Sequence, residues 1–185
     1  MHRQSHPLPS PSLGTQRELV SFHYGTAGVG EKIYLQASLH ADELPGMLVL
    51  HHLRAALANA EAEGRLCGEV VVVPVANPIG LAQSVLRDPQ GRFELGSGEN
   101  FNRRYPELAP PLAERLASQL GPDPCTNKVL IRRAMHTILA EYAPATELEA
   151  LRLTLLRLAC DADVVLDLHA DTEAIVHLYT ETPYW

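Results

Sequence analysis

The fold class follows from one short stretch, Glu69-Val70-Val71-Val72-Val73, which runs on through Pro74-Val75-Ala76 to Asn77-Pro78-Ile79-Gly80. Four consecutive valines are typical of a strand that is buried on both of its faces, as in the parallel sheets of α/β proteins. The Asn-Pro-x-Gly segment that follows breaks the strand. The stretch therefore predicts a central strand of a sheet that helices cover on both sides.

Further strands and helices are predicted on either side of this strand. Upstream, strands are expected at residues 18–24 and 32–39, and a helix with a broad apolar side at residues 44–62, ended by Gly64. Residues 81–106 show no clear period, and a long irregular stretch inside a compact domain is usually functional. Downstream, the sequence predicts helices at residues 111–120, 127–142 and 146–160 and strands at residues 163–168 and 174–179.

Composition limits the class of protein. The 185 residues suit one domain with a real core, and we expect this domain at residues 15–185 after a flexible tail at residues 1–14, which lacks the apolar segment of a signal peptide. A formal net charge of −7 argues against a nucleic-acid partner, and no apolar run of about 18 residues is present to span a membrane. Three cysteines without CxxC spacing predict reduced, buried thiols and a cytoplasmic protein.

Polar side chains follow three of the predicted strands, as His40, Asn77 and His169. Open α/β sheets bind ligands beyond the carboxyl ends of their strands, so these groups are expected to converge there. Glu43 lies three residues after His40 at the start of a predicted helix, where both side chains can face one point. Two imidazoles and one carboxylate are the ligands of a catalytic zinc site that leaves a fourth position for water.

Each candidate residue also has an ordinary structural explanation. A His-x-x-Glu pattern is more often a solvated turn than a metal site, Asp42 can cap the following helix, and His169 can be a hydrogen-bonded core residue. Asn102-Arg103 suits a bidentate grip on a substrate carboxylate, and Arg92 suits the polarisation of a scissile carbonyl. The alternative for these arginines is an ordinary solvated loop.

Four motifs occur in an order that resembles the zinc carboxypeptidases: His40-x-x-Glu43, Asn77-Pro78-x-Gly80, Asn102-Arg103 followed by an aromatic residue and a proline, and Asp167-Leu168-His169. The stretch from His40 to Gly46 resembles most closely the zinc motif of their succinylglutamate desuccinylase/aspartoacylase branch, which commonly has Gly where Ala41 stands. The resemblance extends from about Leu35 to His169. It implies an α/β fold with a mixed, mostly parallel sheet flanked by helices.

The resemblance also implies roles for single residues. It makes a metal site of His40, Glu43 and His169, which bind one Zn²⁺ per chain. It makes a substrate site of Asn77, Asn102 and Arg103. Arg92 resembles the arginine that polarises the scissile carbonyl, with Arg87 as the alternative. The implied reaction is the deacylase type, namely hydrolysis of the amide bond of a small N-acyl amino acid or a peptide-like substrate.

Two departures from the family pattern affect the expected activity. Asn100 stands where many relatives carry an Asp that orients a zinc histidine, so the basicity of that ligand is expected to be lower. The general base is unknown, because Glu173 and Glu181 lie too near His169 in sequence to match the family's general-base glutamate. The C-terminal domain common in this branch is also missing. We therefore expect a chain that is truncated at its C-terminus, or that associates with a second copy or a separate segment.

Three interpretations follow. The first is a zinc-dependent amidohydrolase whose catalytic glutamate lies in missing sequence, so that the 185-residue chain hydrolyses its substrate very slowly or not at all. The second is a pseudoenzyme or incomplete fragment that binds zinc and a carboxylate ligand without turnover. The third is an ordinary α/β domain with chance motifs, which the four ordered motifs disfavour.

Overall fold

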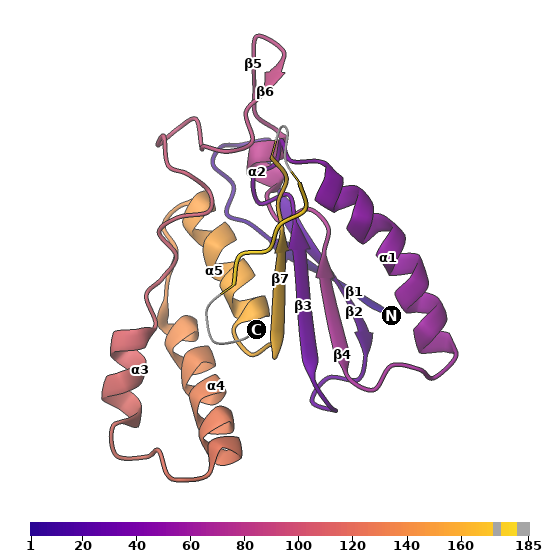
Figure 1. The fold of residues 1–185 in the computed structure, drawn as a ribbon. Helices are drawn as coiled ribbons and strands as arrows, with labels where there is room; N and C mark the ends of the chain where they lie inside the picture. Colours follow the sequence, from indigo (N-terminus) through magenta and orange to yellow (C-terminus); the bar gives the residue numbers. More distant parts are fainter. Residues whose placement is uncertain (172–174, 181–185) are drawn as a thin grey trace.

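The computed structural model describes residues 1–171 and 175–180. Within these residues a five-stranded sheet has the order β1-β2-β4-β3-β7 (Figure 1). β3 pairs in parallel with β4 and β7, whereas the pairs β1–β2 and β2–β4 are antiparallel. The predicted α/β fold with a mixed sheet is confirmed. The strands are β1 (His2–Pro7), β2 (Glu18–Gly25), β3 (Lys32–Ala37), β4 (Glu69–Val73) and β7 (Val164–Leu168).

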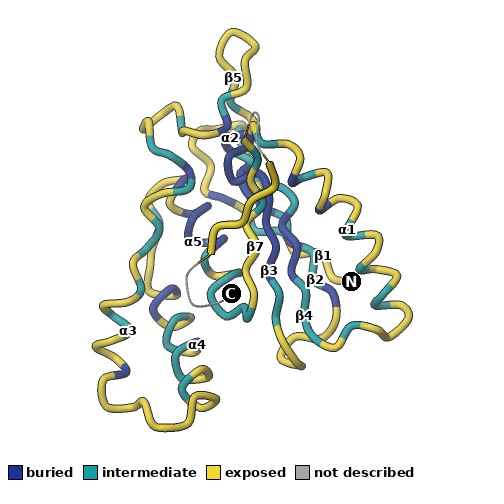
Figure 2. The backbone as a smooth tube through the Cα atoms, viewed as in Figure 1, coloured by how far each residue is buried: buried dark blue, intermediate teal, exposed yellow. Residues whose placement is uncertain are grey.

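Helices cover both faces of the sheet, and alternate side chains of the valine strand β4 belong to the two hydrophobic cores on its opposite faces. Val72 belongs to the core under α1 (Pro45–Ala62). Val71 and Val73 belong to the core under α5 (Glu147–Ala159). Figure 2 shows buried segments of the central strands between these helices. Burial on both faces explains why the strand reads as a continuous apolar run rather than an alternation of apolar and polar residues.

The other helices begin earlier than the apolar pattern indicated. In Figure 1, α3 (Ala109–Leu116) and α4 (Pro124–Glu141) lie on the side of α5. Both have a proline in the first turn, where the missing N–H leaves no hydrogen bond unmade. Asp123 caps α4, and Thr146 with Glu149 forms a capping box at α5. The stretch at residues 81–106 is irregular as predicted, apart from three short elements at or near its start: α2 (Pro78–Leu81), β5 (Ser84–Val85) and β6 (Asp88–Pro89).

The flexible tail predicted at residues 1–14 is wrong for its first half. His2–Pro7 is the edge strand β1, paired with β2 from His2 opposite His23 to Pro7 opposite Glu18. The prediction failed because the side chains of this segment have no apolar period. The strand forms because its backbone N–H and C=O groups make hydrogen bonds to the otherwise free edge of β2. The sheet therefore begins at residue 2, so the domain boundary at residue 15 is too late.

The strand predicted at residues 174–179 is not formed in the part of it that the structure describes. Residues 175–180 have no strand pairing, and Ile175, Val176 and Tyr179 are exposed. The segment has high β-propensity, but β-propensity reflects packing in a sheet and gives no strand without a partner. Residue 174 and the two glutamates Glu173 and Glu181 lie outside the described residues.

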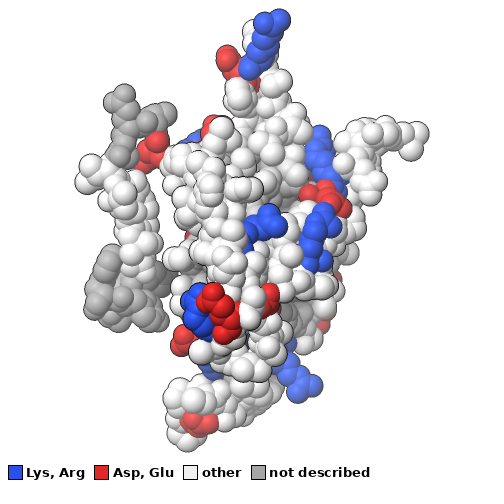
Figure 3. All heavy atoms as spheres, turned by 90° about the vertical axis from the view of Figure 1, so that its right-hand side faces the viewer, with Lys and Arg blue, Asp and Glu red and all other residues white. Residues whose placement is uncertain are grey.

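The exposure of the three cysteines differs from the prediction. Cys67 and Cys125 are exposed and Cys160 is half-buried, so the prediction that the cysteines are buried is wrong. All three are free thiols. The face shown in Figure 3 carries scattered groups of both charges. Within the described residues, no helix has both the length and the apolar character needed to cross a membrane.

Candidate metal centre

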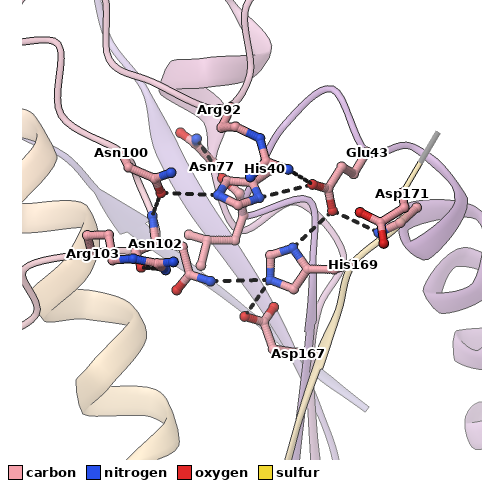
Figure 4. Close-up of polar contacts among 12 residues, drawn as sticks. His40, Glu43, Asn77, Arg92, Asn100, Asn102, Arg103, Asp167, His169 and Asp171 are labelled. Atoms are coloured by element: carbon pink, nitrogen blue, oxygen red, sulfur yellow. Dashed lines mark hydrogen bonds and ion pairs between the residues drawn. The ribbon is translucent and has the colours of Figure 1, made fainter. Parts of the chain in front are cut away.

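Two parallel strands bring the predicted ligands together. β3 and β7 are neighbours with Ala37 opposite Leu168, so the segments that leave their carboxyl ends start side by side. His40 lies three residues beyond β3, and His169 follows β7 directly. Their ring centroids are 4.9 Å apart. Glu43, just before α1, completes the group, which Figure 4 shows at the ends of the strands.

The nitrogen and oxygen atoms of these three side chains lie close enough to one another to bind one metal ion. Nδ1 of His40 lies 3.0 Å from Oε1 of Glu43, and Nδ1 of His169 lies 2.9 Å from Oε2 of the same carboxylate. All three ligand atoms lie within 4.8 Å of one another. His40 is buried and the Glu43 side chain is 9% exposed, whereas the His169 side chain is about one-third exposed. The group therefore has the composition and spacing of a metal site with one side open to solvent.

The outer nitrogens of the two imidazoles are held by acceptors. Nε2 of His40 lies 3.1 Å from Oδ1 of Asn100, which also accepts the N–H of Asn102 at 2.8 Å. Nε2 of His169 lies 3.0 Å from Oδ2 of Asp167. These oxygens accept hydrogen bonds, so in the tautomer that donates from Nε2 each imidazole presents an unprotonated Nδ1 to Glu43. Asn100 thus takes the place predicted from the sequence.

This arrangement sets lone pairs against a carboxylate, and only a positive charge makes it favourable. Two bare Nδ1 atoms and two carboxylate oxygens repel one another unless the imidazoles take up protons or a cation lies between them. Burial raises the pKa of Glu43, but when the imidazoles are protonated, hydrogen bonds from the Ala170 N–H and His40, with the charge of His169, outweigh it and leave this pKa below its usual value. The hydrogen bond to Asp167 raises the pKa of His169 against the opposing effect of burial. The residues present therefore fit a divalent metal ion.

The turn that carries His40 is fixed by its backbone. Ser38 is fully buried with φ at +61°, a left-handed conformation that few side chains adopt, and it turns the chain out of the sheet. The N–H of Ala41 then donates to the carbonyl of Gly91 at 2.9 Å. Gly46 lets α1 pack close to the sheet, because a Cβ there would meet the Cβ atoms of Ala37 and Leu168 at about 3 Å. The motif from His40 to Gly46 is thus one packed unit.

Asn77 does not lie where a substrate could reach it. Its side chain is fully buried, its Oδ1 accepts the N–H of Gly80 at 2.8 Å, and its Nδ2 donates to the carbonyl of Leu39 at 2.9 Å. The amide thus caps α2 and holds the residue before His40. The geometry argues against the predicted substrate contact, and the residue acts through the position of His40.

The two arginines proposed to polarise the carbonyl lie in different places, Arg87 within the short β5–β6 hairpin and Arg92 after it. Arg87 lies in the turn between β5 and β6, which projects away from the sheet in Figure 1. Arg92 lies beside the ligands, and its Nη2 donates to Oε1 of Glu43 at 3.2 Å. Gly91 makes this possible, because any Cβ there would lie 2.1 Å from the backbone nitrogen of Asp42. Of the two, only Arg92 contacts the cluster.

The loop with Asn102 and Arg103 lies on the other side of the cluster. Nδ2 of Asn102 is 3.5 Å from Nε2 of His169. Arg103 is exposed, with its Nη1 donating to the carbonyl of Asn102 at 2.7 Å, so its other donors face solvent beside the cluster (Figure 4). The structure therefore places Asn102 against His169 and Arg103 next to Asn102, and their role as substrate ligands stays a prediction.

A buried arginine on α5, Arg152, was not predicted and holds this loop. Its Nη1 donates to Oε2 of Glu99 and its Nη2 to the carbonyl of Asn100, each at 2.8 Å. The side chain is only 4% exposed. The one signal in the sequence was an arginine on the apolar side of a predicted helix, one turn after Leu148, where a charge requires buried partners.

Arg152→Met should lower the free energy of unfolding by roughly 1.5–3 kcal/mol, the usual worth of a hydrogen bond to a charged group. The loop with Asn100 should also lose its anchor, and zinc affinity should fall with it. Denaturant titration and metal competition measure the two effects. Arg115→Met is the control, because Arg115 pairs with Glu141 at the surface, where an ion pair is worth about 0–1 kcal/mol. Equal losses in both variants would contradict a special role for Arg152.

The fold and the cluster together define an α/β protein with two histidines and one glutamate, grouped so that they could hold a metal ion, at the carboxyl ends of parallel strands. A family model of the succinylglutamate desuccinylase/aspartoacylase catalytic domain matches residues 29–183. The chain belongs to this family. The sequence resemblance seen in the four motifs is thereby confirmed.

Solved structures agree with this assignment. A protein from Shewanella amazonensis, assigned to the same family, superposes with a TM-score of 0.78 at 27% identity, over 92% of this chain and 47% of its own. A protein from Shewanella frigidimarina shares the fold, with a TM-score of 0.74 at 24% identity, over 92% of this chain and 46% of its own. The chain thus spans less than half the length of these two relatives. No protein with curated annotation matches.

Proposed function

We propose that the chain carries the metal centre of a zinc-dependent hydrolase that cleaves the amide bond of a small N-acyl amino acid or a peptide-like substrate. The observation that carries the proposal is the pair of Nδ1 atoms turned onto one carboxylate, 3.0 and 2.9 Å from its oxygens. Membership of a deacylase family supports the reaction type. The free thiols support a cytoplasmic location.

Zinc fits the donor set better than a hard cation does. Two imidazole nitrogens and one carboxylate oxygen are typical of catalytic zinc, whereas magnesium and calcium prefer oxygen ligands alone. The ligands are Nδ1 of His40, the carboxylate of Glu43 and Nδ1 of His169. When bound, zinc would supply a water of lowered pKa and a Lewis acid for the carbonyl. Asn100 and Asp167 would keep both Nδ1 atoms free of hydrogen by holding each Nε2–H.

The side chains around the centre would bind and orient the substrate. Arg103 and Asn102 present a guanidinium and an amide beside His169, which suits the carboxylate of an N-acyl amino acid. Arg92 lies on the opposite side, against Glu43, where it can donate to the oxygen of the scissile carbonyl as negative charge develops on it. A substrate between these arginines would place its amide over the ligands.

The group that takes the proton of the water is unassigned among the described residues. Asp167 is occupied by the imidazole of His169. Asp171 is exposed and pairs with His177 at 3.8 Å. This observation favours a second candidate function, a pseudoenzyme that binds zinc and a carboxylate ligand without turnover. The two functions differ in one measurable quantity, the rate of amide hydrolysis at full zinc occupancy.

The experiment is an assay of the zinc-loaded and chelator-treated protein on a panel of N-acyl amino acids that differ in acyl group and side chain. The hydrolase predicts turnover, slow without a positioned general base, that disappears on chelation and returns with zinc. The pseudoenzyme predicts saturable binding of the same compounds, measured by calorimetry, with no product. Turnover that is unaffected by chelation, or the absence of both binding and turnover, would contradict both functions.

Arg103→Ala should weaken binding of an N-acyl amino acid by about 1.5–3 kcal/mol, because one charge-assisted hydrogen bond to the carboxylate is lost. Calorimetry measures the affinity, and metal analysis checks that zinc content is unchanged. Arg104→Ala is the matched control, since this neighbouring arginine pairs with Glu99 instead. Affinity equal to that of the parent protein would remove Arg103 from the substrate site.

A further inference from the structure

A second group of metal-binding side chains lies at the other end of β7. It consists of His136 on α4 and of Cys160 and Asp161, which follow α5. Asp161 lies three residues before β7 begins, whereas His169 follows directly after β7 ends. The eight residues from Asp161 to His169, at about 3.3 Å per residue along an extended chain, separate the two groups by roughly 20 Å or more. The two sites therefore share no ligand.

The spacing within this group is close to that of a tetrahedral zinc site. Nε2 of His136 lies 3.2 Å from Oδ2 of Asp161 and 4.0 Å from Sγ of Cys160. With Zn–N and Zn–O bonds of about 2.0–2.1 Å and a Zn–S bond of about 2.3 Å, tetrahedral angles place N and O about 3.3 Å apart and N and S about 3.6 Å apart. The N–O separation already matches, whereas the sulfur, which lies 4.0 Å from both ring nitrogens of His136, has to approach Nε2 by a few tenths of an ångström.

The surrounding charges leave one oxygen of Asp161 for a cation. Lys32 pairs with Oδ1 of Asp161, which leaves Oδ2 toward His136. The other two cations near the site, Lys128 and Arg132, both pair with Asp163. A surface cavity of about 160 Å³ is lined by His136 and Asp161, so an ion can enter from solvent.

The thiol of Cys160 is not suited to nucleophilic or redox chemistry by itself. Burial, with the charge of Asp161, raises its pKa to about 11, and a thiol that stays protonated is a poor nucleophile. A metal ion changes this, because thiolate ligation releases the proton to solvent.

We propose that His136, Cys160 and Asp161 form a second metal site for zinc or a similar soft divalent ion, with one coordination position open to solvent. Sulfur, imidazole and carboxylate together favour zinc over magnesium or calcium. The ion would join the C-terminal part of α4 to the connection between α5 and β7. Because it would bind the folded chain and not the unfolded one, it would stabilise this layer of helices against the sheet.

Cobalt(II) is the sharpest probe, since only this site offers sulfur. Cobalt added to the metal-free protein should give the near-ultraviolet charge-transfer band of a thiolate–metal bond. Cys160→Ser and His136→Ala should abolish the band, whereas Cys125→Ser, an exposed thiol on the same helix as His136, should leave it unchanged. His169→Ala should also retain the band, which separates this test from any result at the first centre.

Zinc analysis gives the second measurement. The parent protein should bind two zinc ions per chain, Cys160→Ser one, and zinc should raise the Tm of His169→Ala but not that of the double variant His169→Ala/Cys160→Ser. His136→Ala, a change at an exposed side chain, gives the same reading if Cys160→Ser folds poorly. A parent protein without the sulfur band, or a band that survives Cys160→Ser, would overturn the proposal.

Discussion

His169→Ala and His40→Ala should each empty the first metal centre at zinc concentrations that fill it in the parent protein. Loss of an outer partner of a metal ligand typically costs about 10–100-fold in affinity, and loss of the ligand itself should cost more. The measurement is zinc competition with a chelator, made in the Cys160→Ser background so that only one site is counted. Hydrolysis of any N-acyl amino acid that the parent protein cleaves should disappear with the zinc.

Two other variants provide reference values for this loss of zinc affinity. Asp167→Asn should lower zinc affinity within the 10–100-fold range expected of an outer partner, since an amide that accepts from Nε2 of His169 adds no charge. His51→Ala, at an exposed histidine on α1, should leave affinity unchanged. Undiminished zinc in both His40→Ala and His169→Ala would refute the ligand assignment.

The residues of the His40–Glu43–His169 cluster were predictable because their proximity depends mainly on strand order. A valine run typical of a doubly covered strand indicated a sheet with parallel strands, and such strands end at one edge. His40 and His169 both follow strands, and the pairing of β3 with β7 brings them to the same edge. The spacing of Glu43 from His40 then needs only a helix start, which Pro45 and Gly46 supply.

The roles that the sequence missed depend on contacts between distant segments. Asn77 follows a strand like the two histidines, and nothing local indicated that its amide would be used up by the backbone of Leu39 and Gly80. The contact of Arg152 with Asn100 joins positions 52 residues apart. β1 has no apolar signal of its own and exists because the edge of β2 is free to pair.

Arg87 and Arg92 show most clearly what a fold adds to a pattern. They are five residues apart in an irregular stretch, and the sequence offered both for the carbonyl. The hairpin of β5 and β6 carries Arg87 away from the sheet, while the close contact of Gly91 with Asp42 brings the next residue, Arg92, against Glu43. Of these two arginines only Arg92 contacts the cluster, so we expect the scissile carbonyl to be polarised by Arg92.

Arg92→Ala should lower kcat by about 10²–10³-fold, or roughly 2.7–4 kcal/mol, the usual cost of losing one donor to a developing oxyanion. Zinc content should be unchanged, because Arg92 touches Glu43 without being a ligand, and KM should change much less than kcat, since the interaction strengthens in the transition state. Arg92→Lys should recover part of the rate, as it keeps the charge but not the planar fork. Steady-state kinetics at full zinc occupancy, on the best substrate of the panel, measure all three effects. Arg87→Ala is the control and should behave like the parent protein. A variant without Arg92 that keeps its kcat, beside a slow Arg87→Ala, would mean that the hairpin folds over the centre when substrate binds.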